Sequence, residues 1–286
     1  MARSGIGSRG YSTERSRAEV EDYWRLSSRP LHVLVLIAPL VIAYEIGAVL
    51  YLTGSNAQQT TTIAARKVLQ MFFANFGVAG VVASGAVLAA VLLVLLLMHI
   101  MSKQSWKIRW MVLAGMVLEA ALWALPLVVF GAVFKRAAAI VTRGVAEGHV
   151  TVNTLAAAAL QGRGGTEDLK DLPLMAKATI AVGAGIYEEL LFRLIGIAAL
   201  HFVVRDVLQG KETVAKVIAV LGTAVAFAAY HPIPPLNGGV NWPLLAFFTV
   251  AGVYFGVIYV NRGLGIVVAT HAIYDLIALD VLSGMR

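Results

Sequence analysis

Long apolar runs, each the length of a membrane-crossing helix, make up most of this chain. They cover residues 31–52, 71–101, 110–134, 172–204, 213–230, 242–260 and 264–282. A helix needs about 20 apolar residues to cross the hydrocarbon core of a bilayer. The 286 residues are 59% hydrophobic and only 14% charged, unlike a soluble domain. The sequence therefore predicts an all-α fold, a polytopic transmembrane helical bundle of about seven or eight spans.

The N-terminal end differs from the rest of the chain because it is polar and basic. We predict a basic cytoplasmic tail over residues 1–30, followed by a single integral membrane domain over residues 31–286 in the cell membrane. The polar insertion at 135–171 is expected to form a loop with one or two short helices. Orientation in an anionic membrane explains the formal net charge of +7, so we expect membrane lipid and no nucleic acid as partners.

The apolar run at 172–204 is interrupted by three ionisable residues, Glu188, Glu189 and Arg193. A charge in hydrocarbon costs at least about 2.5 kcal/mol, so three charges close together indicate a function. Glu189 and Arg193 are four residues apart on a helix, which predicts an ion pair that supports the site. Glu188 is turned about 100° away and is free to act as a general base.

Two later apolar runs carry a histidine with a partner four residues away. These pairs are Phe227 with His231 and His271 with Asp275. We expect the C-terminal helices to enclose one polar cavity in which all these groups meet. In such a cavity Glu188 would activate a water molecule, His231 would help to position it, and His271 with Asp275 would stabilise a developing oxyanion. This is the chemistry of hydrolysis.

The ordered set Glu188-Glu189-x-x-x-Arg193, Phe227-x-x-x-His231 and His271-x-x-x-Asp275 resembles three motifs of a known family. This is the CAAX protease and bacteriocin-processing family, called CPBP or ABI, which includes the Ras-converting CAAX prenyl endopeptidases. The resemblance covers the core at 172–282. It implies an intramembrane glutamic endopeptidase that works without a cofactor or a metal ion.

The resemblance also implies a substrate and a role for each site residue. Glu188 would activate the water, His231 would align it, and His271 with Asp275 would form the oxyanion site. The substrate would be a membrane-attached or hydrophobic peptide or protein, and its C-terminal tail is one expected place of cleavage. Asp275 stands where the eukaryotic and archaeal prenyl endopeptidases usually have Asn. An ionised Asp cannot donate a hydrogen bond, so Asp275 would have to be protonated or would act by orienting His271.

The residues alone leave other functions open. Glu188, His231 and His271 are also a possible zinc set of two histidines and one glutamate. Intramembrane acids and histidines form proton relays in transporters, and Glu45 and Glu119 fit that picture more naturally than they fit a protease. A non-proteolytic membrane scaffold or a proton-coupled transporter is therefore the alternative function.

Overall fold

The computed structural model describes residues 22–52, 64–75, 77, 80–144, 172–231, 233 and 240–284, and every regular element in these segments is a helix. In chain order they are α2 (Pro30–Gly47), η1 (Ala48–Leu52), α3 (Ala64–Ala74), α4 (Gly80–Ser102), α5 (Trp110–Gly144), α7 (Leu174–Glu188), η2 (Glu189–Ile197), α8 (Ala198–Phe202), η3 (Val203–Val207), α9 (Glu212–Tyr230) and α10 (Trp242–Gly284). The elements η1, η2 and η3 are π-helical. The predicted all-α fold is confirmed.

Several of these helices suit a membrane. Four candidate spans are present among the described residues: Pro30–Leu52, Trp110–Phe134, Glu212–Tyr230 and Trp242–Leu279. Gly85–Met101 is a shorter apolar helix. The protein is therefore an all-α membrane bundle, as predicted. The number of crossings and the cytoplasmic side of the N-terminus stay predictions.

The helix boundaries differ from the sequence prediction in two places. The run predicted at 71–101 is divided between α3 and α4, and Gly77 in the connection has a φ of 77°, which favours glycine. Helix α5 continues past the apolar run to Gly144, because residues 135–144 are mostly good helix formers. The rest of the predicted loop and most of the predicted tail lie outside the described residues, although residues 22–27 are helical.

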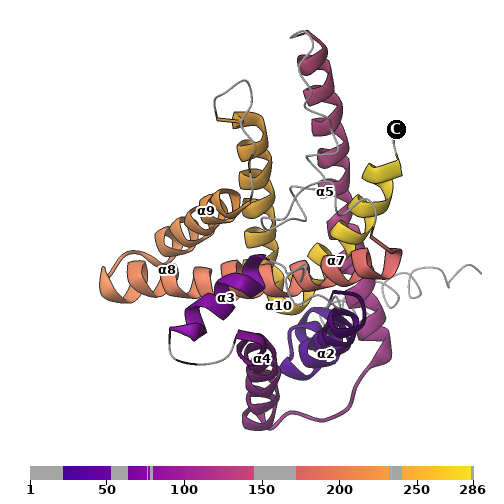
Figure 1. The fold of residues 1–286 in the computed structure, drawn as a ribbon. Helices are drawn as coiled ribbons and strands as arrows, with labels where there is room; N and C mark the ends of the chain where they lie inside the picture. The colour runs from indigo at the N-terminus through magenta and orange to yellow at the C-terminus, as the bar shows by residue number, and fades with distance from the viewer. Residues whose placement is uncertain are drawn as a thin grey trace, which may run out of the picture.

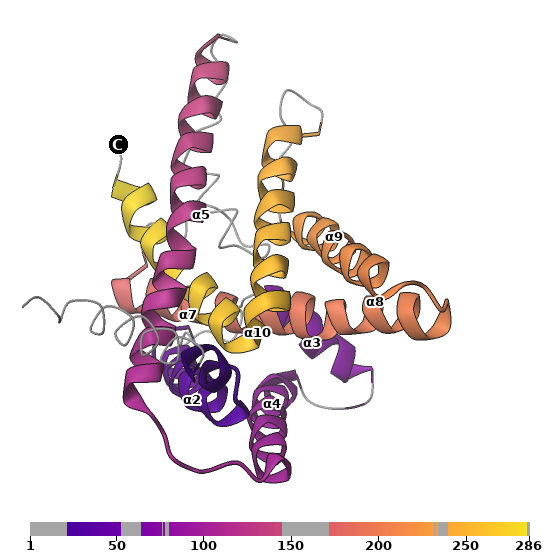
Figure 2. The same ribbon diagram turned by 180° about the vertical axis from the view of Figure 1, so that it is seen from behind.

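A continuous helical segment through the middle of the bundle carries the first motif. It runs from α7 through η2 and α8 to η3, with α9 and the first half of α10 on one side and α2 and α4 on the other (Figures 1 and 2). Helix α10 packs against α5, α7 and α9, and α2 packs against α7. The motif-bearing segment is thus covered on both sides, which removes its charged residues from lipid.

Helix α10 changes direction at Gly263, whose φ of 79° and ψ of −177° are not helical. The sequence predicted two separate apolar helices at 242–260 and 264–282, and the break lies where this prediction placed it. Only glycine adopts such a positive φ without strain. The two halves of α10 can therefore approach the same site from different directions.

A largely buried ion pair lies next to this break. Arg262 donates to Glu119 of α5 through Nε at 2.5 Å and through Nη2 at 2.7 Å. The Tyr23 hydroxyl donates to the same carboxylate, and the Arg262 guanidinium lies 3.7 Å from the centre of the Trp24 ring. These contacts join the N-terminal segment, α5 and α10, and they give Glu119 a partner that the sequence could not identify.

Glu119→Leu should lower the melting temperature of the detergent-purified protein, because it leaves the buried Arg262 guanidinium without its carboxylate. Breaking one side of a buried ion pair costs about 3 to 5 kcal/mol, whereas replacing both partners by apolar groups is often close to neutral. The double variant Glu119→Leu/Arg262→Met should therefore regain most of the lost stability. Equal melting temperatures for the single and double variants would contradict this role of the pair.

Candidate active site

The first motif lies where α7 changes into the π-helical segment η2. Helix α7 ends at Glu188, and η2 begins at Glu189. Glu188, Glu189 and Arg193 are 4%, 0% and 1% exposed, so all three charges are inside the protein. Short π-helical segments occur often at functional sites because they change the direction of neighbouring side chains. Here the two adjacent glutamates have different partners.

Glu189 holds the charged groups of the site together. Its Oε1 atom lies 3.1 Å from Arg193 Nη1 and 2.6 Å from His271 Nδ1. Arg193 Nη2 also donates to the Gly252 carbonyl at 3.2 Å, and the guanidinium lies 4.4 Å from the centre of the Phe227 ring. The predicted pairing of Glu189 with Arg193 is present, and it connects η2 with α9 and with both halves of α10.

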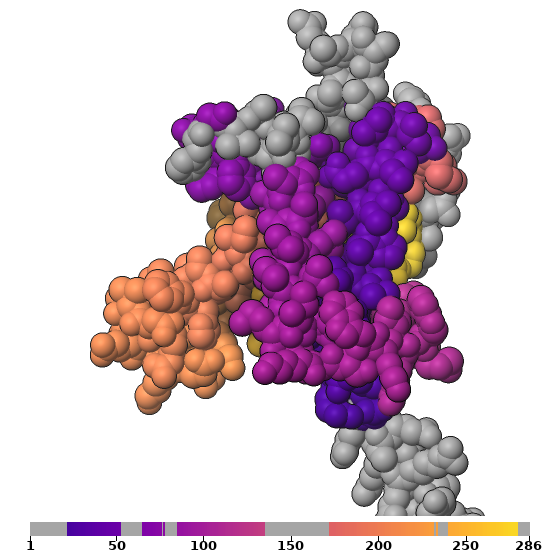
Figure 3. All heavy atoms as spheres, turned by 90° about the horizontal axis from the view of Figure 1, so that it is seen from below, coloured from indigo at the N-terminus to yellow at the C-terminus, as the bar shows by residue number. Residues whose placement is uncertain are grey.

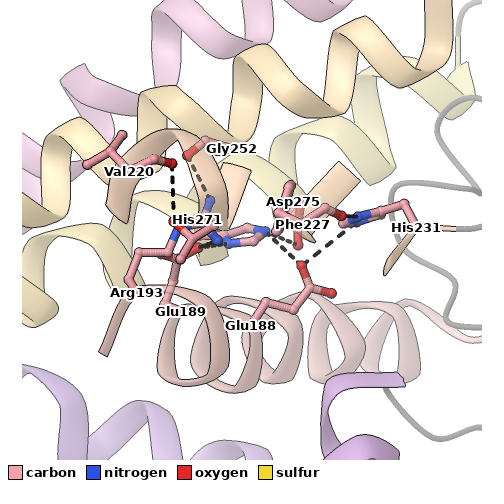
Figure 4. Close-up of polar contacts among 10 residues, drawn as sticks. Glu188, Glu189, Arg193, Val220, Phe227, His231, Gly252, His271 and Asp275 are labelled. Carbon is pink, nitrogen blue, oxygen red and sulfur yellow. Dashed lines mark hydrogen bonds and ion pairs between the residues drawn. The ribbon is translucent and has the colours of Figure 1, made fainter. Parts of the chain in front are cut away.

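Glu188 points away from this ion pair and towards two imidazole rings (Figure 4). Its Oε2 atom is 3.8 Å from His231 Nε2 and 3.9 Å from His271 Nε2. Both distances exceed those of direct hydrogen bonds. The structure therefore brings together the three residues that the sequence placed in one cavity, one from α7, one from the end of α9 and one from α10.

The end of α9 fixes the orientation of His231. The helix stops at Tyr230, and the His231 backbone N–H bonds to the Ala228 carbonyl, so the Phe227 carbonyl is left to accept from the imidazole. His231 Nδ1 lies 2.8 Å from this oxygen. A carbonyl can only accept, so Nδ1 carries the hydrogen and Nε2 of the neutral ring is an acceptor.

His271 is oriented in the same way by a different acceptor. Its Nδ1 atom donates to the Glu189 carboxylate, so Nε2 of the neutral ring is again an acceptor. Asp275 Oδ2 lies 3.5 Å from this Nε2, and Asp275 is 1% exposed. Asp275 thus lies next to the nitrogen that faces Glu188, and it is the fourth polar residue of the site after Glu188, His231 and His271.

Two phenylalanines of the first half of α10 support the imidazoles, and sequence reasoning missed both. The His231 ring stacks on Phe248 with centroids 4.0 Å apart, and the His271 ring stacks on Phe255 at 4.4 Å. Sequence reasoning also missed Gly252, whose carbonyl accepts from Arg193. Phe248, Gly252 and Phe255 follow the spacing of one helix face, a signal that could have found them.

The site does not have the arrangement of a metal centre among the described residues. No group of three or more histidine, aspartate or glutamate side chains in this part of the chain is placed to hold a metal ion. One nitrogen of each imidazole bonds to a protein oxygen, which leaves the other nitrogen, Nε2, facing Glu188.

Comparison with known proteins agrees with the location of the site. Residues 171–277 match the family model described as "Type II CAAX prenyl endopeptidase Rce1-like". The matched segment begins just before α7 and includes every residue of the polar site. No curated protein and no solved structure matches the chain.

Gly185→Ala should destabilise the protein, because Gly185 lets α7 approach α10 beside the site. A Cβ atom at Gly185 would lie 2.8 Å from the backbone nitrogen of Ala272, the residue after His271. Overpacking of this kind costs about 1 to 3 kcal/mol. Gly85→Ala is the matched control, since a Cβ atom there has nothing within 4 Å. Thermal unfolding in detergent compares the two, and equal effects would show that the close approach is unimportant.

Proposed function

We propose that this chain, which carries an Rce1-like domain of the type II CAAX prenyl endopeptidase family at residues 171–277, is an intramembrane glutamic endopeptidase. The observation that carries the proposal is the position of Glu188. Its carboxylate is not paired with Arg193, which binds Glu189, and it faces the Nε2 atoms of two imidazoles at 3.8 and 3.9 Å. This arrangement suits a group that takes a proton from a water molecule held between them.

The proposed first step uses both hydrogens of that water. In the bound water, one O–H group donates a hydrogen bond to Glu188 and the other donates a hydrogen bond to His231 Nε2. The His231 ring is fixed by the Phe227 carbonyl. The water oxygen attacks the carbonyl carbon of the scissile peptide while Glu188 takes the proton. Glu188 then gives this proton to the leaving amine nitrogen, and the carbon–nitrogen bond breaks. The carboxylate is regenerated, so no cofactor is consumed.

His271 stabilises the oxyanion in this mechanism as a charged imidazolium. A neutral His271 could not donate from Nε2, because its hydrogen is on the Nδ1 atom that bonds to Glu189. In the charged form Nδ1 donates to Glu189 and Nε2 donates to the developing oxyanion. Asp275 Oδ2, 3.5 Å from Nε2, orients the ring. Asp275 is therefore a positioning residue here and need not donate.

The substrate we propose is a membrane-attached peptide or protein, and its C-terminal tail is one expected place of cleavage. The site is buried inside an apolar bundle, so a substrate anchored in the same membrane reaches it more easily than a free soluble chain. The family description points to prenylated tails as the first substrates to test. The protein would act in the cell membrane with its N-terminus in the cytoplasm.

Glu119 and Glu45, the two acids that suggested a transporter, have hydrogen-bond partners outside the active site. Glu119 is held by Arg262, Tyr23 and Trp123. Glu45 accepts from the Tyr187 hydroxyl at 3.4 Å. Both acids therefore have local partners of their own, which favours the hydrolase over a proton pathway as the explanation of the polar site.

Glu188→Gln should abolish cleavage while the protein stays folded, because an amide of the same shape cannot take the proton. General-base catalysis contributes about 100- to 10,000-fold, and we expect a loss of that size. A labelled farnesylated C-terminal peptide is the first substrate, and membrane proteomes with and without the variant are compared for an uncut protein. Glu212→Gln is the control, since Glu212 is exposed at the start of α9. Undiminished cleavage by Glu188→Gln would refute the mechanism.

Cleavage should also persist after treatment with a metal chelator such as 1,10-phenanthroline. The proposed steps move protons only between a water, Glu188 and the substrate, so removal of metal ions leaves them unchanged. Metal analysis of the purified protein accompanies the assay. Stoichiometric zinc together with chelator-sensitive cleavage would instead support the set of two histidines and one glutamate as a metal site.

A further inference from the structure

Among the described residues, two groups stand out in the set of buried polar atoms without a hydrogen-bond partner, which also includes single atoms of His201, Tyr230 and Thr270. One group belongs to the active site and includes oxygens of Glu188, Glu189 and Asp275. The second group lies elsewhere and consists of Arg29 Nε, His32 Nδ1, both ring nitrogens of His99, and Gln104 Oε1. Buried polar groups in proteins are nearly always bonded, so a cluster of exceptions asks for an explanation.

The second cluster lies where α2 begins and α4 ends. His32 is near the start of α2 and His99 is near the end of α4, and each is 1% exposed. Residues 103–109 cover them: the Arg109 backbone N–H donates to His32 Nε2 at 3.4 Å, and the Trp106 ring lies 4.5 Å from the His99 ring. Figure 3 shows α2 and α4 side by side on this face of the protein.

Most of the unpartnered atoms are hydrogen-bond donors. His32 Nε2 accepts from Arg109, so Nδ1 of the neutral ring carries the hydrogen and has no acceptor. Arg29 Nε can only donate, and at least one nitrogen of His99 is a donor. The amide of Gln104 can present either its oxygen or its nitrogen. An acceptor with several oxygens would satisfy the donors of this set.

The charges around the cluster are positive. Arg29, Arg109 and His99 are the charged or titratable groups that face His32. The nearby carboxylate, Asp22, is already bound by Arg25 and Arg109, and the hydrogen bond from Arg25 lowers the pKa of Asp22. Two guanidinium groups disfavour a metal cation at this position and favour an anion.

The surroundings place the cluster at the edge of the apolar part of the bundle. Helices α2 and α4 are apolar on one side of it, and residues 103–109 are mostly polar or basic on the other. Large side chains here are exposed, with Met101 at 79% and Trp110 at 72%. Tryptophan is typical of the membrane–water boundary, where lipid phosphates lie.

We propose that Arg29, His32, His99 and Gln104 bind a phosphate group at this boundary, and that its source is the headgroup of an anionic phospholipid. Arginine and imidazole donors recognise phosphate oxygens through charge-assisted hydrogen bonds. Bound phosphate would join the beginning of α2 to the end of α4. This site is separate from the active site and does not depend on the proposed endopeptidase function.

The test measures the melting temperature of the full-length protein in detergent with three additives. Dihexanoyl-phosphatidylglycerol should raise it, whereas dihexanoylglycerol, which has the same chains without the phosphate, should not. Arg29→Gln should require about tenfold more phosphatidylglycerol for the same shift, the loss expected for one charge-assisted hydrogen bond. Lys107→Gln is the matched control, because it removes an equal charge from an exposed position in the same segment.

The remaining outcomes separate the sources of the anion. Inorganic phosphate is the third additive, and an Arg29-dependent shift with it alone would support the site but assign it to free phosphate. His99→Phe keeps an aromatic ring beside Trp106 and removes both nitrogens, so it replaces Arg29→Gln if that variant does not fold. An equal loss in Lys107→Gln, an equal shift with dihexanoylglycerol, or no shift with any additive would overturn the proposal.

Discussion

The carboxylate of Glu189 holds the centre of this protein together. It is fully buried and would be very costly to ionise alone, but Arg193 forms an ion pair with its Oε1 atom and His271 a hydrogen bond. Arg193 continues the network to the Gly252 carbonyl. One acid thereby fixes η2 against both halves of α10. Since Glu189 takes up the guanidinium, the neighbouring Glu188 is left to face the two histidines.

Adjacent glutamates can have opposite tasks only if their surroundings differ. Glu189 is bound on one side by a guanidinium and an imidazole, which fix its side chain in place. Glu188 lies 3.8 Å or more from either imidazole nitrogen and is free to exchange a proton. The Nδ1 atom of His231 bonds to the Phe227 carbonyl, and that of His271 bonds to Glu189. These two bonds orient the rings so that both Nε2 atoms face Glu188. The proposed mechanism follows from this division of roles.

Much of this arrangement could be predicted from the sequence because helical spacing is local. Four-residue intervals predicted the Glu189–Arg193 pair, and the length of the apolar runs predicted the bundle. Partners far apart in the chain could not be predicted, and Glu119 with Arg262 is the clearest case. The free carbonyl of Phe227 also depends on where α9 ends. Phe248 and Phe255 looked like ordinary apolar residues until the imidazoles were seen to stack on them.

The break at Gly263 links the Glu119–Arg262 pair to the active site. His271 lies eight residues after Gly263, which is about 12 Å along a helix. A change of about 10° in the direction of the second half of α10 would therefore move His271 by roughly 2 Å. Such a shift would break the 2.6 Å contact with Glu189 and disturb the position of Nε2 opposite Glu188. Arg262 precedes the break, and its bonds to Glu119 hold α10 at the point where this direction is set.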